Sequence, residues 1–86
     1  MAVIGGHFWM AGIRDISTTG ISLICPYQIQ PETLLTVELV NSPGTFTHTV
    51  LAWVRRVAPN RKGSGFVIGC SFPMELRDDE LQSLLK

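Results

Sequence analysis

Apolar and polar residues alternate along much of this chain, and a period of two is typical of a strand with one buried face. The pattern is clearest at residues 34–40, where Leu35, Val37 and Leu39 alternate with more polar neighbours. The same alternation, together with many β-branched and aromatic residues, predicts four further strands. They are expected at His7–Arg14, Gly20–Cys25, Phe46–Val57 and Phe66–Phe72.

The last two of these strands are long enough for their faces to be assigned from the alternation. The residues expected to face the core are Phe46, His48, Val50, Ala52 and Val54 in the first and Phe66, Ile68, Cys70 and Phe72 in the second. Short turns rich in proline, asparagine and glycine separate the strands. Such turns connect neighbouring antiparallel strands.

The C-terminal segment has the pattern of a short helix over about residues 78–85. Asp78 is expected to cap it, and acidic residues in its first turn suit the positive end of the helix dipole. Leu81, Leu84 and Leu85 form a narrow apolar stripe that is expected to close one end of a barrel. We therefore predict an all-β fold for a single domain over residues 1–86, a small antiparallel barrel of five to six strands with this helix at its end.

Composition narrows the classes of protein to which the chain can belong. Only 16% of the 86 residues are charged, against an average of about 25%, which favours docking onto a protein partner or a second copy. The net charge of zero argues against nucleic acid as a general partner. Cys25 and Cys70 lie in apolar strands, as expected for reduced thiols in a cytoplasmic protein. The apolar start, residues 1–13, lacks a basic flank and is too short for a membrane span.

A polar turn is expected between the first two strands, with the sequence Asp15-Ile16-Ser17-Thr18-Thr19-Gly20. Aspartate and serine oxygens accept hydrogen bonds from nearby amides, and glycine takes positive φ where a Cβ would clash. Asp15 and Ser17 therefore either satisfy the backbone of the turn or face a ligand from a strand end. Arg14, beside them, either attracts an anion or is a solvated charge.

These residues resemble the Asp/Asn-x-Ser-x-x-Gly signature of PilZ domains, small bacterial β-barrels that bind the second messenger cyclic di-GMP. Asp15, Ser17 and Gly20 occupy its three fixed positions, and the expected order of strands and helix is similar from about Met10 to Leu85. The resemblance implies a signalling module with cyclic di-GMP as its ligand and no cofactor. It further implies that Asp15 and Ser17 contact guanine or phosphate, that Gly20 shapes the turn and that Arg14 is auxiliary.

One departure from the family pattern concerns positive charge. PilZ domains that bind the nucleotide carry an Arg-x-x-x-Arg motif before the first strand, whose guanidinium groups hold phosphate and guanine. Arg14 is the only arginine before Asp15 in this chain. Two interpretations follow. Either a longer natural N-terminus supplies the arginines and orders around the nucleotide, or the binding of cyclic di-GMP is weak or lost.

A second group of basic residues lies far downstream, at Arg55, Arg56, Arg61 and Lys62, without the spacing of that motif. It is interpreted either as a site for phosphate or a partner, or as a solvated hairpin end that keeps an edge from aggregating.

The remaining motifs of the sequence favour no enzyme. The chain has no nucleophile elbow, no Walker-type phosphate loop and no HExxH, and its histidines and cysteines lack the spacing of a metal site. Two alternative functions remain open. One is a nucleotide-independent interaction or oligomerisation module that uses Phe8, Trp9 and Trp53; the other is a single-stranded nucleic-acid binder of the small-barrel type.

Overall fold

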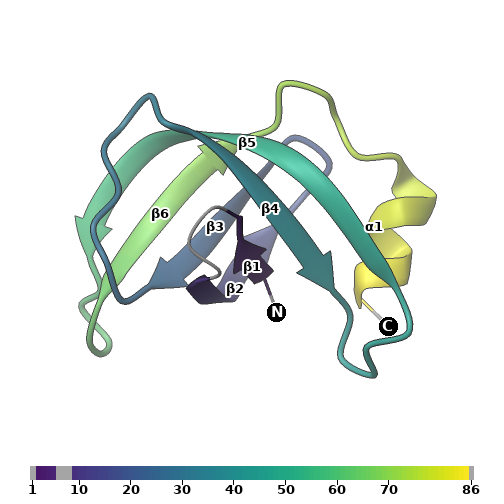
Figure 1. Ribbon diagram of the computed structural model, residues 1–86, viewed down its shortest axis with the longest axis horizontal. Coiled ribbons are helices and arrows are strands. Elements are labelled where there is room, and N and C mark those ends of the chain that lie inside the picture. Colours follow the sequence, from purple (N-terminus) through teal and green to yellow (C-terminus); the bar gives the residue numbers. More distant parts are fainter. Residues whose placement is uncertain (1, 6–8, 86) are drawn as a thin grey trace.

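The strands of this chain close into a barrel (Figure 1). The computed structural model describes residues 2–5 and 9–85, and within them all neighbouring strands are antiparallel, in the order β1-β2-β3-β6-β5-β4. This confirms the predicted all-β barrel with a C-terminal helix. The elements are β1 (Ala2–Ile4), β2 (Trp9–Ile16), β3 (Gly20–Cys25), β4 (Leu34–Val40), β5 (Thr47–Pro59), β6 (Phe66–Ser71) and α1 (Asp78–Leu85).

The N-terminal part of the barrel differs from the prediction in two respects. β1 was not predicted, because three residues are too few to display a period of two, yet Ala2 and Ile4 are fully buried between β2 and β4. β2 continues to Ile16, two residues past the predicted end, since Asp15 and Ile16 still pair with β3. The predicted strand start at His7, and Phe8 after it, lie outside the described residues.

The interior of the barrel is filled by alternate residues of each strand, as predicted for β4 and β6. Leu23, Val37, Val54 and Ile68 are all fully buried. The predicted inward face of the strand Phe46–Val57 is buried at Ala52 and Val54 but only half-buried at Phe46, His48 and Val50, and Phe46 lies just before the start of β5. The core is continuous, and within the described residues every buried side-chain nitrogen or oxygen has a hydrogen-bond partner.

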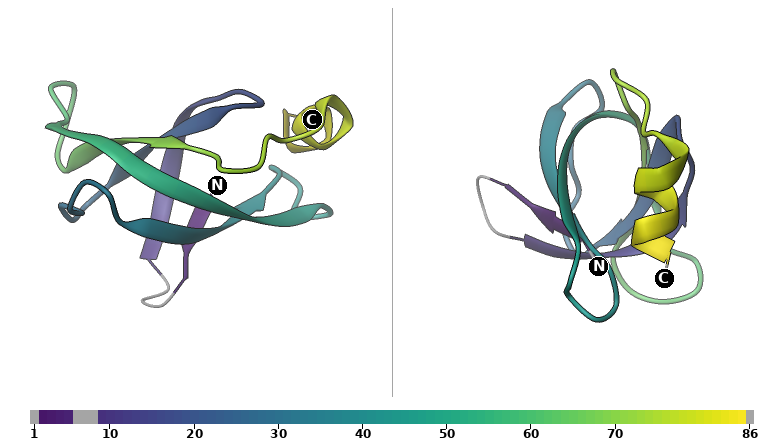
Figure 2. Two further views of the ribbon diagram at one scale, coloured as in Figure 1. Left: turned by 90° about the horizontal axis from the view of Figure 1, so that it is seen from above. Right: turned by 90° about the vertical axis from the view of Figure 1, so that its right-hand side faces the viewer.

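The helix α1 lies over one end of the barrel (Figure 2). Leu81 and Leu84 pack against the core as predicted, and Leu76, just before the helix, is buried. The expectation for Leu85 was wrong, because its side chain is 61% exposed. It is the last residue of the helix and lies at the outer edge of the stripe, about 40° from Leu81 and about 100° from Leu84. No helix within the described residues is long and apolar enough to span a membrane.

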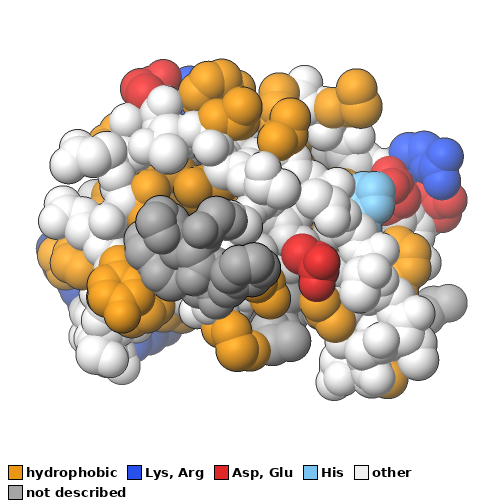
Figure 3. Space-filling view, in the orientation of Figure 1, with side chains coloured by type: hydrophobic (Ala, Val, Ile, Leu, Met, Phe, Trp, Pro, Cys, Tyr) orange, Lys and Arg blue, Asp and Glu red, His pale blue; other side chains and the backbone are white. Residues whose placement is uncertain are grey.

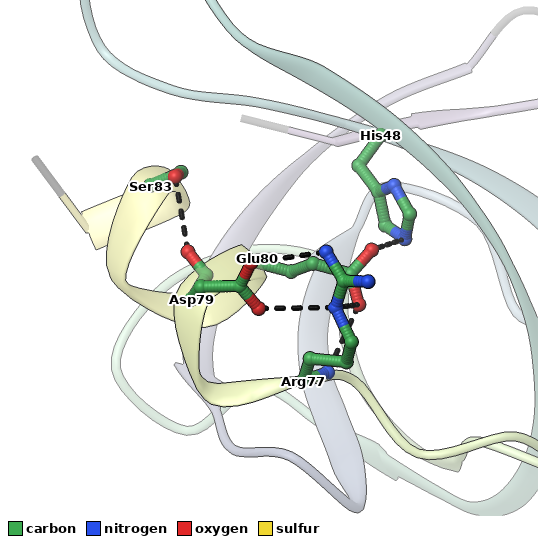
Figure 4. Close-up of polar contacts among 5 residues, drawn as sticks. All are labelled: His48, Arg77, Asp79, Glu80 and Ser83. Atoms are coloured by element: carbon green, nitrogen blue, oxygen red, sulfur yellow. Dashed lines mark hydrogen bonds and ion pairs between the residues drawn. The ribbon is translucent and has the colours of Figure 1, made fainter.

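Glu80 fixes the start of the helix, and not Asp78 as predicted (Figure 4). The Arg77 carbonyl accepts a hydrogen bond from the Leu81 amide at 3.0 Å, which makes Arg77 the N-cap residue, and one Glu80 oxygen accepts a hydrogen bond from the backbone amide of Arg77 at 2.9 Å. The other oxygen lies 2.9 Å from Nε2 of His48 on β5. His48 and the charged side chains around the helix start gather at one edge of the molecular surface (Figure 3). Glu80 thus begins the helix and attaches it to the barrel.

We expect Glu80→Ala to lower the free energy of unfolding by about 1 to 2 kcal/mol, because it removes a capping bond and a partly buried pair with His48. Urea unfolding followed by circular dichroism measures the change. Asp78→Ala is the matched control, since it removes a neighbouring acidic group in the first turn without a specific partner and should cost less than about 0.5 kcal/mol. Equal losses in the two variants would contradict the role given to Glu80.

Candidate functional site

The predicted turn between β2 and β3 is shorter than expected and consists of residues 17–19. Ser17 serves the turn itself, because its Oγ accepts a hydrogen bond from the Thr19 amide at 3.2 Å. Asp15 does not. It lies at the end of β2, its side chain is 74% exposed, and its carboxylate contacts only Arg14, at 3.8 Å, within the described part of the chain. The structure therefore leaves the Asp15 carboxylate available to a ligand.

Gly20 has a different role from the one that the sequence suggested. Its φ is not in the left-handed region, so the turn does not need glycine for its backbone angles. A Cβ on Gly20 would instead lie 2.5 Å from the carbonyl oxygen of Cys70 on β6. Glycine is required because β3 and β6 approach closely at this point, where the barrel surface next to Asp15 is formed.

Two β-bulges expose pairs of adjacent charged residues on the outside of the barrel. The register of β2 against β3 shifts between Ile13 and Asp15, and Arg14 and Asp15 are both exposed. The register of β5 against β6 shifts in the same way between Val54 and Arg56, so that Arg55 and Arg56 are both exposed. A bulge breaks the inside–outside alternation and re-aims side chains, and bulges are frequent beside functional sites.

The outer surface of β3 and β6 forms the floor between these two bulges. The strand registers align Asp15, Ser22, Gly69 and Arg56 in one row across four strands. At roughly 4.8 Å between strands, Asp15 and Arg56 lie about 14 Å apart along the curved surface of the barrel. The residues between them, Ser22 and Gly69, have small or no side chains, so the surface is recessed between the two charged residues. A second row on the same face is apolar and comprises Ile24, Val67 and Ala58.

These surfaces line one open groove with a volume of about 1250 Å³. One end of the groove reaches the β2–β3 turn, and the other end reaches the hairpin between β5 and β6. The turn and the hairpin lie on the same side of the barrel (Figure 2). Asp15 is the only acidic residue among its described lining residues. Five of the seven basic residues of the sequence also line it, namely Arg14, Arg55, Arg56, Arg61 and Lys62. Although the net charge of the whole chain is zero, the groove is therefore positively charged.

The motif and the downstream basic cluster, which are 40 residues apart in the sequence, thus share one surface. The sequence identified both groups but gave no reason to place them together. Their proximity depends on β6 pairing with β3 on one side and with β5 on the other. Cations from β5 and the hairpin therefore lie on the same surface as Asp15 and Ser17, and the argument against nucleic acid from net charge does not apply to this face.

The cysteines contribute no reactive group to the groove. Cys70 lines it from below, but burial raises the pKa of its thiol to about 11, so the thiol stays protonated at neutral pH. Cys25 is fully buried and reduced. Within residues 2–5 and 9–85, no group of three or more histidine, cysteine or acidic side chains is arranged to hold a metal ion. The chemistry that the groove offers is the binding of an anion.

Comparison with known proteins identifies one family. A model of the PilZ domain matches residues 2–86, which is nearly the whole chain. No curated protein and no solved structure gives a significant match.

Proposed function

The chain belongs to the PilZ domain family, whose known role is cyclic di-GMP signalling, and from this premise we propose that it binds cyclic di-GMP in the groove between the two bulges. The observation that carries the proposal is the position of Asp15. Its carboxylate has no structural task in the turn, and it lies at the edge of a groove with a large excess of positive charge. An exposed carboxylate at the edge of a positively charged groove suits a ligand that is both anionic and rich in N–H donors.

The two rows of the floor suit the two parts of a guanine nucleotide. A carboxylate accepts hydrogen bonds from the N–H groups of a guanine edge, and Asp15 stands at the β2 side of the polar row. The apolar row of Ile24, Val67 and Ala58 offers a flat surface on which a planar base can pack. The cations from β5 and the hairpin suit the phosphates. Ser17 acts mainly through the shape of the turn, and Gly20 acts by allowing β3 and β6 to approach closely.

We expect Asp15→Ala to weaken cyclic di-GMP binding by roughly ten- to a hundredfold, the loss typical for a hydrogen bond to a charged group. Isothermal titration calorimetry of the ligand into the full chain measures the affinity. The thermal midpoint should remain close to that of the wild type, because Asp15 has no buried contact.

Glu38→Ala is the matched control for this experiment. Glu38 is an exposed acidic residue on the outer face of β4, outside the groove, so the variant makes the same change in net charge. Its affinity should equal that of the wild type. A wild-type chain that gives no saturable heat, or two variants that bind equally well, would refute the proposed function.

A protein partner or a second copy of the chain stays a prediction. The observation that favours it is a separate exposed apolar surface on the outside of β4 and β5. Leu34 and Leu51 are 44% and 49% exposed, and Leu34 lies opposite Trp53 in the strand register. Trp9 belongs to β2, but its side chain is not described. In a signalling module, such a surface would transmit the bound state of the groove to the partner.

A further inference from the structure

The five basic residues of the groove differ in how far their charge is already compensated. Arg14 pairs with Asp15 at 3.8 Å. Arg55 pairs with Glu32 at 3.1 Å, donates a hydrogen bond to Ser71 at 2.9 Å and lies over the ring of Trp53. In the described part of the chain, the side chains of the other three form no ion pair with a carboxylate. The uncompensated charge of the groove therefore belongs to Arg56, Arg61 and Lys62.

We propose that Arg56, Arg61 and Lys62 form the phosphate-binding subsite of the groove. The assignment rests on the proposed function for the identity of the ligand, but the subsite itself is defined by its charge and position. Its cations come from β5 and the following hairpin, whereas Arg14 is the only arginine before Asp15. A dianionic ligand then lies across the floor, with its base edge at Asp15 and its phosphates towards Arg56.

Local hydrogen bonds fix the backbone of the hairpin that carries Arg61 and Lys62. The side chain of Asn60 donates to the carbonyl of Ser64 at 3.1 Å and accepts from the amide of Lys62 at 3.2 Å, while the Asn60 amide donates to the carbonyl of Gly65 at 2.9 Å. A subsite organised in this way loses little conformational freedom when a ligand binds, which favours affinity.

Gly65 fixes the hairpin against β3. Its φ is 83°, and a Cβ at this position would lie 2.6 Å from the carbonyl oxygen of Cys25. The hairpin therefore approaches the end of β3 as closely as a backbone can, beside the apolar row that begins at Ile24. From the polar row to the hairpin, the three steps along β5 from Arg56 to Pro59 span roughly 10 Å. The three cations thus border one side and one end of the floor.

The test is calorimetric titration of cyclic di-GMP into the full chain and its variants. We expect Arg56→Ala, Arg61→Ala and Lys62→Ala each to weaken binding by about tenfold, and the triple variant to lose saturable binding at high micromolar ligand. Arg77→Ala is the matched control, because it removes a cation outside the groove whose side chain pairs with Asp79. It should bind as the wild type does. The three subsite residues are exposed, so the variants should keep the wild-type thermal midpoint.

A second probe separates the subsite from the identity of the ligand. Inorganic pyrophosphate, titrated into the ¹⁵N-labelled chain, should shift the amide resonances of residues 60–65 saturably, and the triple variant should abolish this shift. If cyclic di-GMP binds but the three single variants match Arg77→Ala, the subsite is wrong and the proposed function stands. If only pyrophosphate binds, at the hairpin, the proposed function is wrong and the phosphate subsite stands. If neither binds, both are refuted.

Discussion

Replacing Gly20 by alanine is expected to lower the free energy of unfolding by roughly 2 to 4 kcal/mol, a large loss for a single methyl group on the barrel surface. The added Cβ would lie 2.5 Å from the carbonyl oxygen of Cys70, and backbone atoms of a closed barrel cannot move aside as a flexible side chain can. The strands β3 and β6 would have to separate where Gly20 pairs with Ser71. At about 4 to 8 °C per kcal/mol for a domain of this size, the thermal midpoint should fall by roughly 10 to 30 °C.

Gly69→Ala is the control for this prediction. Gly69 belongs to the same pair of strands, but a Cβ there would meet only the Cβ of Arg56, at 3.6 Å, and its carbonyl oxygen, at 3.8 Å, which are ordinary contacts. Differential scanning calorimetry of the two variants should therefore show a large drop for Gly20→Ala and a small change for Gly69→Ala. Similar midpoints would mean that the close approach of the strands is not what requires glycine at position 20.

Gly20 also illustrates what the sequence could predict about the site. Its place in the motif was recognised, but its physical role was assigned to a positive φ, because local sequence shows only local reasons for a glycine. The true reason is a carbonyl on β6, 50 residues later in the chain. The same limit applies to the groove. Arg55 and Arg56 were identified as a cluster, but their position near Asp15 follows from the strand order and not from any spacing in the sequence.

The fold was more predictable than the site, because alternation reports directly which side of a strand is buried. Leu35, Val37 and Leu39 are buried as predicted. The alternation fails where it is interrupted, and both interruptions border the groove. At the two bulges, adjacent charged residues face outward together, and a strict period of two would have placed one residue of each pair inside. The features that the pattern could not predict are those that build the groove.

The neighbours Leu23 and Ile24 on β3 allow a test of whether the inner face of this strand determines stability and its outer face determines binding. Leu23 is fully buried inside the barrel, whereas Ile24 is half-buried and lies on the floor of the groove. We expect Leu23→Ala to lower the free energy of unfolding by roughly 3 to 5 kcal/mol, through lost burial and the cavity left behind. For Ile24→Ala we expect about 1 kcal/mol or less, because neighbouring solvent and side chains can fill the space.

The affinities should follow the opposite order. Ile24→Ala removes apolar surface under the bound base and should weaken cyclic di-GMP binding by about three- to tenfold, as burial of one or two methylene groups is worth roughly 1 kcal/mol. Leu23→Ala should bind with nearly wild-type affinity at temperatures where it remains folded, since its side chain does not reach the groove. Urea unfolding and calorimetric titration of the same two samples measure both quantities. If Leu23→Ala weakened binding by the larger factor, the groove would depend on the packing of the core beneath it, and the outer face of β3 would not be a binding surface in its own right.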